Sequence, residues 1–131
     1  MSDFPSTFRE WLRDATALGV PAEVVAFAFN LFEQTTEDPR FGVEFVGTDR
    51  FELDDPDWAC SEVWEPSGGR SLNIPRVFSG ADWATCLARM IELVKGVVVD
   101  GDELGAMLRS ATGVAVGFVD GELVVTHARA P

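Results

Sequence analysis

The C-terminal stretch GVAVGFVDGELVVTHA, residues 113–128, constrains the fold more than any other part of the sequence. Two runs of alternating apolar residues flank Asp120-Gly121, and an Asp-Gly pair favours a type I′ turn, in which both central residues adopt positive φ. The stretch therefore predicts an antiparallel hairpin with a two-residue turn. This register pairs Val119 with Glu122, Phe118 with Leu123, Val116 with Val125, and Val114 with His127.

The same register divides the hairpin into two unlike faces, because successive side chains of a strand point to opposite sides. One face is largely apolar and carries Val114, Val116, Phe118, Leu123, Val125 and His127. The other face is smaller and more mixed and carries Ala115, Gly117, Val119, Glu122, Val124 and Thr126. His127, the only histidine, thus extends an apolar face at the open end of the hairpin.

Two stretches in the first half of the chain are predicted to form another hairpin. The stretch EVVAFAFNLFEQ, residues 23–34, is ambiguous between helix and strand, since as a helix it is apolar nearly all round. Its β-branched and aromatic content, and the turn-like TTEDPR before the alternating run FGVEFVG (41–47), favour a strand. As a strand it places on one face Val25, Phe27, Phe29 and Leu31.

Two weaker strand signals follow. The stretch SLNIPRV, residues 71–77, follows the turn PSGGR, and Pro75 restricts it to a sheet edge or a strand end because proline cannot donate a ladder hydrogen bond. The stretch WACSEVWE, residues 58–65, is also predicted to be a strand, with one face formed by Trp58, Cys60, Glu62 and Trp64.

Three helices are predicted over residues 6–18, over residues 80–95 and near residues 102–109. In the first, Thr7 and Glu10 fit a capping box. Ser79 is predicted to cap the second helix. The apolar stripe of this second helix should face the sheet and consists of Trp83, Leu87, Met90, Ile91 and Val94.

The order of these elements predicts the fold class. Strands grouped in the middle of the chain, with helices segregated around them, favour an α+β fold with a mostly antiparallel sheet, helices packed against it and a C-terminal β-hairpin. A doubly wound sheet is disfavoured because strands and helices do not alternate. The 131 residues contain no repeat, low-complexity tract or Gly/Ser linker, so we expect residues 1–131 to form a single domain.

The charge balance excludes several classes of partner. With 22 acidic and 10 basic residues the chain has a formal net charge of -12, which disfavours nucleic acids and anionic membranes because both require Lys and Arg. The charge is uneven: residues 37–65 contain ten acids and two arginines. Such a segment serves solubility in many proteins, but it also suits a basic partner.

The expected compartment follows from hydropathy and cysteine content. No apolar run reaches the ~18 residues that span a bilayer, and the N-terminal residues MSDFPSTFREW lack the basic-then-apolar pattern of a secretion signal, so we expect a cytoplasmic protein. Cys60 and Cys86 are too few for a disulfide scaffold or a closed zinc site. Both are expected to be buried small hydrophobic residues, with a disulfide between them as the alternative.

The sequence contains no P-loop, G-x-G-x-x-G, G-x-S-x-G, H-E-x-x-H or C-x-x-C motif. We therefore expect a protein that is not an enzyme and that requires no cofactor. The alternative is a small enzyme or small-ligand binder in which His127 acts as a general base, with Cys60 or Cys86 as the nucleophile. The pattern around His127 favours a half-buried residue at the edge of the core over that role.

The stretch FELDDPDWAC, residues 51–60, is the most acidic part of the chain. A calcium loop of the EF-hand type requires a central glycine and a distal glutamate, and this stretch has Pro56 in its middle instead. A glycosidase-like pair requires one carboxyl group with a raised pKa in a cleft, and adjacent solvated aspartates rarely provide that asymmetry. A solvated loop and a protein-binding surface remain, and an adventitious hard-cation site is a lesser alternative.

The protein-binding interpretation depends on carboxylates that stand next to aromatic residues. Charges steer a partner and aromatic side chains anchor it. Surface carboxylates also complement the Lys and Arg by which nucleases hold phosphates. The predicted partner-binding residues are Glu52, Asp54, Asp55, Asp57, Trp58 and Glu62.

The succession FAFNLFE, FGVEFVGTDRFELDDPDWACSEVW and GVAVGFVDGELVV resembles small acidic single-domain proteins of bacteria, which are associated with the immunity proteins of polymorphic toxin systems. The resemblance covers residues 25–65 and 113–125. It implies a non-catalytic protein that neutralises a cognate toxin by binding it, and it assigns no functional residues.

These observations predict a non-catalytic acidic protein-binding domain that binds a basic protein partner, with a toxin-neutralising, immunity-type role as its most concrete form. Two alternatives stay open. One is the enzyme or small-ligand binder that uses His127 near the C-terminal hairpin. The other is a homodimer or homo-oligomeric structural subunit, formed through the Gly117 face or an exposed strand edge.

Overall fold

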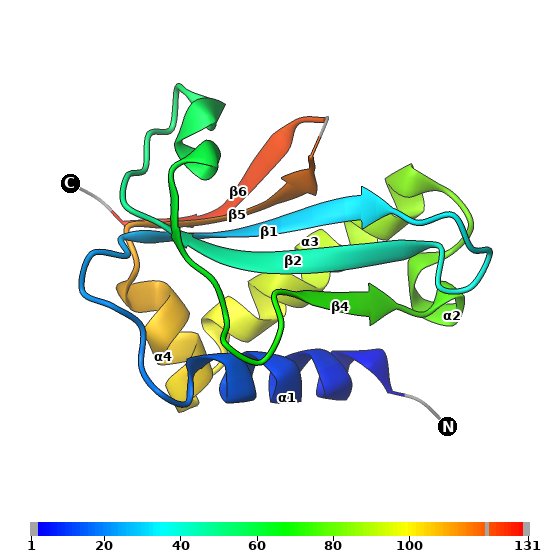
Figure 1. Ribbon diagram of the computed structural model, residues 1–131, viewed down its shortest axis with the longest axis horizontal. Coiled ribbons are helices and arrows are strands. Elements are labelled where there is room, and N and C mark those ends of the chain that lie inside the picture. The colour runs from blue at the N-terminus through cyan, green and yellow to red at the C-terminus, as the bar shows by residue number, and fades with distance from the viewer. Residues whose placement is uncertain (1–2, 120, 130–131) are drawn as a thin grey trace.

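The computed structural model describes residues 3–119 and 121–129 and shows an α+β fold built on one six-stranded sheet (Figure 1). The strands lie in the order β3-β2-β1-β5-β6, and β4 also pairs with β2. The elements are α1 (Phe4–Thr16), β1 (Ala26–Glu33), β2 (Phe41–Thr48), the 3-10 helix η1 (Pro56–Cys60), β3 (Glu62–Trp64), β4 (Ser71–Ile74), α2 (Arg76–Ser79), α3 (Trp83–Val99), α4 (Glu103–Ser110), β5 (Gly113–Phe118) and β6 (Leu123–Ala128).

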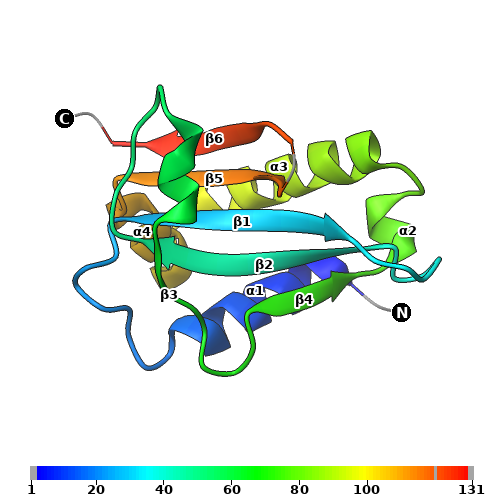
Figure 2. The same cartoon turned by 45° about the horizontal axis from the view of Figure 1, so that its top comes forward.

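The sheet is antiparallel except at one place. The β1–β2 hairpin and the C-terminal β5–β6 hairpin are both present, which confirms the predicted fold class and the strand assignment of the ambiguous stretch in the first half of the chain. The exception is the parallel pair of β1 with β5, in which Phe29 lies opposite Val116. This pair joins the two hairpins into one sheet (Figure 2).

The sheet has a helix face, covered by α1, α3 and α4, and an outer face, crossed by η1 (Figures 1 and 2). On the helix face, the large side chains of β1, β2 and β5 pack against these helices. The buried residues there include Phe27, Phe29, Leu31, Phe45 and Val116 from the strands and Phe8, Leu12, Met90 and Val94 from the helices. On the outer face, small residues of the same strands form a second cluster around Trp58.

The helices begin at residues other than the expected ones. Asp3 caps α1, its carboxylate accepting from the Ser6 backbone N–H, so the capping box at Thr7 is wrong. Asp82 caps α3 and Asp102 caps α4, through the backbone N–H groups of Thr85 and Gly105. Ser79 instead ends the short helix α2.

The later start of α3 changes its apolar stripe. Met90 and Val94 are buried against the sheet as predicted, and Leu87 and Ile91 pack against the same core. Trp83 is 62% exposed, because it is the first residue of the helix and lies beyond the buried turns. Its predicted position facing the sheet is wrong.

The C-terminal hairpin has a different register from the predicted one. Val114 lies opposite His127 as predicted, but Val116 lies opposite Val124 and Gly117 opposite Leu123. A β-bulge between the Val114–His127 pair and the Ala115–Val125 pair inserts one extra residue into β6 and shifts the register by one. Leu123 and Val125 therefore pack with the outer-face cluster, away from His127. Of the predicted turn, Asp120 lies outside the described residues.

No helix in the described ranges is both long and apolar enough to cross a membrane.

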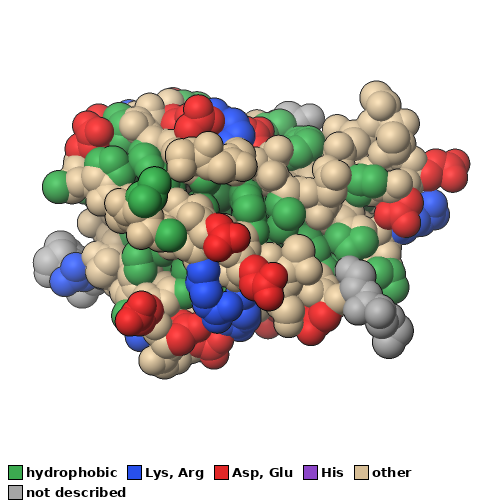
Figure 3. Space-filling model, turned by 60° about the horizontal axis from the view of Figure 1, so that its bottom comes forward, with side chains coloured by type: hydrophobic (Ala, Val, Ile, Leu, Met, Phe, Trp, Pro, Cys, Tyr) green, Lys and Arg blue, Asp and Glu red, His purple; other side chains and the backbone are tan. Residues whose placement is uncertain are grey.

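Acidic and basic side chains are mixed on the α1 side of the molecule (Figure 3). Arg9 pairs there with Asp100, and Arg13 with Asp102 at 3.3 Å. The acidic excess is therefore not concentrated on the helix face.

The two aspartate caps on α3 and α4 predict a pH dependence of folding. The pKa of Asp82 is lowered from its usual 3.8, mainly by the Thr85 N–H, and the pKa of Asp102 is lowered mainly by the Gly105 N–H and further by Arg13. A carboxylate with a lowered pKa contributes stability that is fully present above about pH 4 and is lost as the pH falls through the folded-state pKa.

We therefore expect the free energy of unfolding to fall less steeply from pH 4 to about pH 2 in an Asp82→Asn/Asp102→Asn variant than in the wild type. Asparagine also caps helices, so the variant should fold. Urea denaturation at a series of pH values measures the slopes. The control, Glu10→Gln/Asp14→Asn, removes two exposed carboxylates that cap no helix, and an equal loss of slope there would contradict the assignment.

Candidate functional site: an acidic loop on the outer face

The acidic loop, defined as residues 49–57, leaves the end of β2 and runs into η1 over the outer face of the sheet (Figure 2). Five of its nine residues are acidic and one, Arg50, is basic. The loop lies where β2 ends and β1 begins, since Thr48 pairs with Ala26. It contains or adjoins five of the six predicted partner-binding residues.

Two aromatic side chains hold the loop on the sheet. Trp58 is only 1% exposed and packs in the outer-face cluster, whose other buried members are Ala26, Ala28, Val46 and Ala115. Its ring lies 4.8 Å from the ring of Phe51, in an edge-on arrangement. Phe51 covers Gly113, where any Cβ would come within 2.2 Å of the ring. Small residues on β1 and β5 thus create the space that these rings fill.

The predicted strand over residues 58–65 is only partly correct. Residues 62–64 form β3, but Pro56–Cys60 is a 3-10 helix, because Asp55 caps it and Pro56 provides the fixed φ of a first helical position. Trp58 and Trp64 therefore do not share a face. The Trp64 ring packs on the helix side, 5.7 Å from Phe45.

Asp55 stabilises the loop from within. Its carboxylate accepts from the Asp57 backbone N–H at 3.0 Å and from Arg50 at 3.2 Å. These contacts, first the backbone hydrogen bond and then the arginine charge, lower the pKa of Asp55. Arg50 also contacts Glu52 at 2.6 Å. Two of the predicted contact residues, Glu52 and Asp55, thus share one internal cation.

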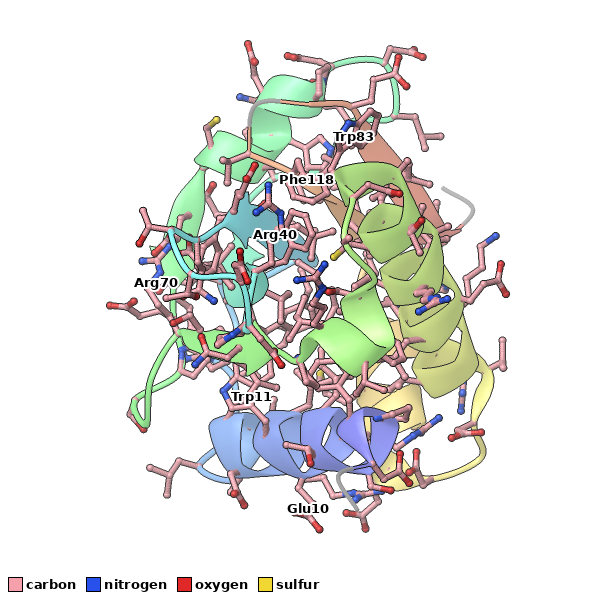
Figure 4. All side chains as sticks on the ribbon, turned by 90° about the vertical axis from the view of Figure 1, so that its right-hand side faces the viewer. Glu10, Trp11, Arg40, Arg70, Trp83 and Phe118 are labelled. Carbon is pink, nitrogen blue, oxygen red and sulfur yellow. The ribbon has the colours of Figure 1, made fainter. Side chains whose placement is uncertain are left out.

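Glu62 is engaged by an arginine from outside the acidic segment. Arg70 donates to both carboxylate oxygens of Glu62 at 2.7 and 2.9 Å, and also to Glu44 at 2.6 Å and Glu65 at 2.9 Å. The bonds to Glu62 and Glu44 raise the pKa of Arg70. Figure 4 shows Arg70 at the sheet edge among oxygen-bearing side chains. Part of the charge of residues 37–65 is therefore neutralised locally.

Fewer carboxylates of the loop are exposed and without an ion-pair partner than the sequence indicated. Among the described residues, no basic side chain lies within ion-pair distance of Asp49, Asp54 or Asp57, and all three are exposed. Leu53, which directly precedes Asp54, is 68% exposed. The sequence predicted Trp58 as a contact residue, whereas the exposed large apolar side chain of the loop is Leu53. The available signal was an apolar residue flanked by Glu52 and Asp54 in a loop.

His127 and the cysteines lie in separate places. The His127 ring is within hydrogen-bond distance of the Arg109 carbonyl, 3.0 Å away, at the end of α4. Cys60 belongs to η1 on the outer face, whereas His127 shares the face of Val114. Cys86 is buried in the core, and burial raises the pKa of its thiol to about 12, so it stays protonated at neutral pH. The structure does not bring His127 and Cys60 together, and Cys60 is exposed rather than buried as predicted.

Two clefts lie away from the acidic loop. One of about 910 Å³ lies between α1, residues 17–25 and α4, and its lining includes Arg13, Val20, Phe27 and Met107. The other, of about 540 Å³, lies where β1 and β5 end and includes Trp83 and Phe118. His127 is among the lining residues of neither. Over residues 3–119 and 121–129, no group of three or more His, Cys, Asp and Glu side chains has the geometry to hold a metal ion.

Comparison with protein-family models, with curated proteins and with solved structures finds no match to this chain. The functional interpretation therefore depends on the chemistry of the surfaces. The acidic loop combines an exposed leucine, unpaired carboxylates and a buried aromatic support. That combination is suited to contact with a macromolecule.

The burial of Trp58 predicts that it supports the fold. Replacement of a buried tryptophan by alanine leaves a cavity, so Trp58→Ala should lower the free energy of unfolding by about 3–5 kcal/mol. The matched control is Trp83→Ala, at a position where the side chain is 62% exposed, and it should cost about 1 kcal/mol or less. Urea denaturation measures both values. Equal costs for the two variants would contradict the packing described above.

The three glutamates around Arg70 predict a second effect. Arg70→Gln removes the shared cation and leaves Glu44, Glu62 and Glu65 to repel one another. Because the Arg70 side chain is 37% exposed, solvent weakens each pair, and we expect a loss of about 1–2 kcal/mol in total. Lys95→Gln, which makes the same change in net charge at an exposed position of α3, should cost less.

Salt provides an independent check on the Arg70 network. The difference between Arg70→Gln and Lys95→Gln should shrink when thermal or urea unfolding is repeated in about 1 M NaCl, because exposed charges are then screened within about 3 Å. A difference that is unchanged by salt would mean that Arg70 stabilises the protein by packing alone.

Proposed function

We propose that this protein is a non-catalytic binding domain whose acidic loop recognises a basic surface on a protein partner. The observation that carries the proposal is the outward side of the loop. Leu53 is 68% exposed there next to Asp54 and in the same loop as Asp57, while Trp58 is fully packed. An apolar residue and free carboxylates are thus presented together on a rigid support.

The physical basis is that charged and apolar residues contribute differently to an interface. Exposed carboxylates attract a positively charged partner and accelerate association, and an apolar side chain that enters a pocket contributes affinity. A loop that is already held in place loses little conformational entropy on binding. Arg50 and Trp58 provide that preorganisation here. Because Trp58 is buried, it acts as a support in this proposal and its contact role is transferred to Leu53.

The biological role that fits this chemistry is toxin neutralisation in the bacterial cytoplasm, as an immunity-type protein. Enzymes that cut nucleic acids hold phosphates with Lys and Arg, and closely spaced carboxylates complement such a surface. The support for this role is the net charge of -12 and the cluster of Asp49, Asp54 and Asp57 on one loop. The resemblance described above points in the same direction.

Capture from the native cytosol identifies the partner. Three immobilised baits are compared at low and high salt: the wild type, the loop variant Leu53→Ser/Asp54→Asn/Asp57→Asn, and the control Glu10→Gln/Asp14→Asn. The control residues are exposed on α1, on the other side of the sheet, and Figure 4 shows Glu10 pointing away from it. A protein retained by the wild type and the control, but not by the loop variant, is the expected result.

Kinetics with the purified partner then test the electrostatic mechanism. At low ionic strength, Asp54→Asn/Asp57→Asn should slow association about threefold to tenfold, and physiological salt should reduce this difference because the Debye length is then about 8 Å. Leu53→Ser should mainly accelerate dissociation. Stopped-flow fluorescence measures both rates. An association rate that responds neither to salt nor to the double change would exclude the loop as the contact surface.

A further inference from the structure

At the opposite end of β1 from the acidic loop lies a cleft of about 540 Å³ with a different chemistry. It is walled by aromatic and apolar side chains and bordered by two carboxylates. Its main lining residues are Phe32, Glu33, Trp83, Leu87, Phe118 and Glu122. We propose that this aromatic cleft binds a small organic cation, of the quaternary ammonium class.

The aromatic walls have the geometry that such a ligand requires. The rings of Trp83 and Phe118 lie 6.3 Å apart at an interplanar angle of 88°, so that they form two perpendicular walls. Figure 4 shows these two side chains together, one at the start of α3 and the other at the end of β5. A cation is attracted to the face of an aromatic ring within about 6 Å of its centre, most strongly for tryptophan.

The walls are also held in place. The Phe118 ring packs edge-on against Phe41 at 5.6 Å, and Phe41 is buried in the core. Trp83 begins an α-helix whose N-terminus is fixed by the Asp82 cap. Trp83 nevertheless remains 62% exposed, which leaves much of this large aromatic side chain available to a ligand.

The charge of the lining selects a cation. Glu33 and Glu122 are in the lining, and no Lys or Arg is among its residues. Arg40 contacts one oxygen of Glu33, Oε2, at 2.8 Å. Among the described residues, no basic side chain lies within ion-pair distance of Glu122. Glu122 therefore gives the border of the cleft a negative charge that no described cation pairs with, which repels an anion and attracts a cation.

A quaternary ammonium group matches both features. Its methyl groups pack on aromatic faces, its charge is spread over them, and it is desolvated at low cost compared with a primary amine. The volume of the cleft is within the range of about 300–1,000 Å³ typical of small-molecule sites. The occupant is thus a free small cation. This site lies apart from the acidic loop, so its failure would leave the proposed function intact.

The test uses choline as the probe and its neutral carbon isostere, 3,3-dimethyl-1-butanol, as the matched comparison, at constant ionic strength. NMR titration of the whole protein should show saturable shifts at the Trp83 indole N–H and the Phe118 amide with choline. The isostere should bind about threefold to thirtyfold more weakly, the range that the cation–aromatic attraction supplies. Equal binding of the two probes, or no saturation with choline, would overturn the proposal.

Variants locate the site. Trp83→Ala should weaken choline binding about threefold to thirtyfold, and the exposed change Glu122→Gln about twofold to fivefold. Glu103→Gln, an exposed carboxylate beside the other cleft, should leave choline binding unchanged. Glu122→Gln tests the site independently of the aromatic wall. A trimethyllysine peptide that binds at this site where choline does not would replace the free cation with a protein segment and overturn the assignment.

Discussion

Strand β1 is buried on both faces, but its side chains are large on one face and small on the other. The rest of the structure depends on this asymmetry. On the helix face, Phe27, Phe29 and Leu31 fill the space under α1 and α3. On the outer face, Ala26 and Ala28 leave room for the indole of Trp58. A strand that buries both faces needs a cover on each, since apolar area gains stability only when it is removed from water. Helices supply one cover, and the short η1 segment supplies the other.

The cover on the outer face is also what makes the acidic loop a distinct surface. A polar loop of nine residues has little reason to adopt one conformation, because ordering the backbone costs about 1–2 kcal/mol per residue. Burial of Trp58 and partial burial of Phe51 against Gly113 offset part of that cost. Arg50 then connects Glu52 and Asp55. These contacts fix the conformation of the loop, so its exposed side chains are also held in place. This is the basis of the proposed binding function.

The net charge counted along a segment of sequence differs from the charge that this segment exposes to a partner. Residues 37–65 contain ten acids and two arginines, yet Arg70 alone engages three of those acids from outside the segment. Arg50 engages two more. The carboxylates that face solvent without a cation are fewer and are concentrated at Asp49, Asp54 and Asp57. The aromatic cleft at the other end of β1 has a separate and smaller acidic border.

The sequence by itself determined the features that depend on neighbouring residues. Alternation predicted β1, β2 and the C-terminal hairpin, helical spacing predicted α1 and α3, and their order predicted the α+β class. The acidic stretch was recognised, and Asp54 and Asp57 were among its predicted contact residues. These patterns are local, because the period of the side chains follows directly from the backbone geometry of a helix or a strand.

Only the tertiary structure decided what depends on residues far apart in the chain. The parallel pairing of β1 with β5 joins residues separated by about ninety positions, and no periodicity encodes it. The bulge in β6 places Leu123 and Val125 on the outer face, where they pack with the cluster around Trp58. It therefore depends on residues that are distant in the sequence. Trp58 became a support because Ala26, Ala28 and Ala115 leave a space for it. Leu53 is the exposed apolar residue of the loop, because the outer-face cluster packs around Trp58 and does not include Leu53.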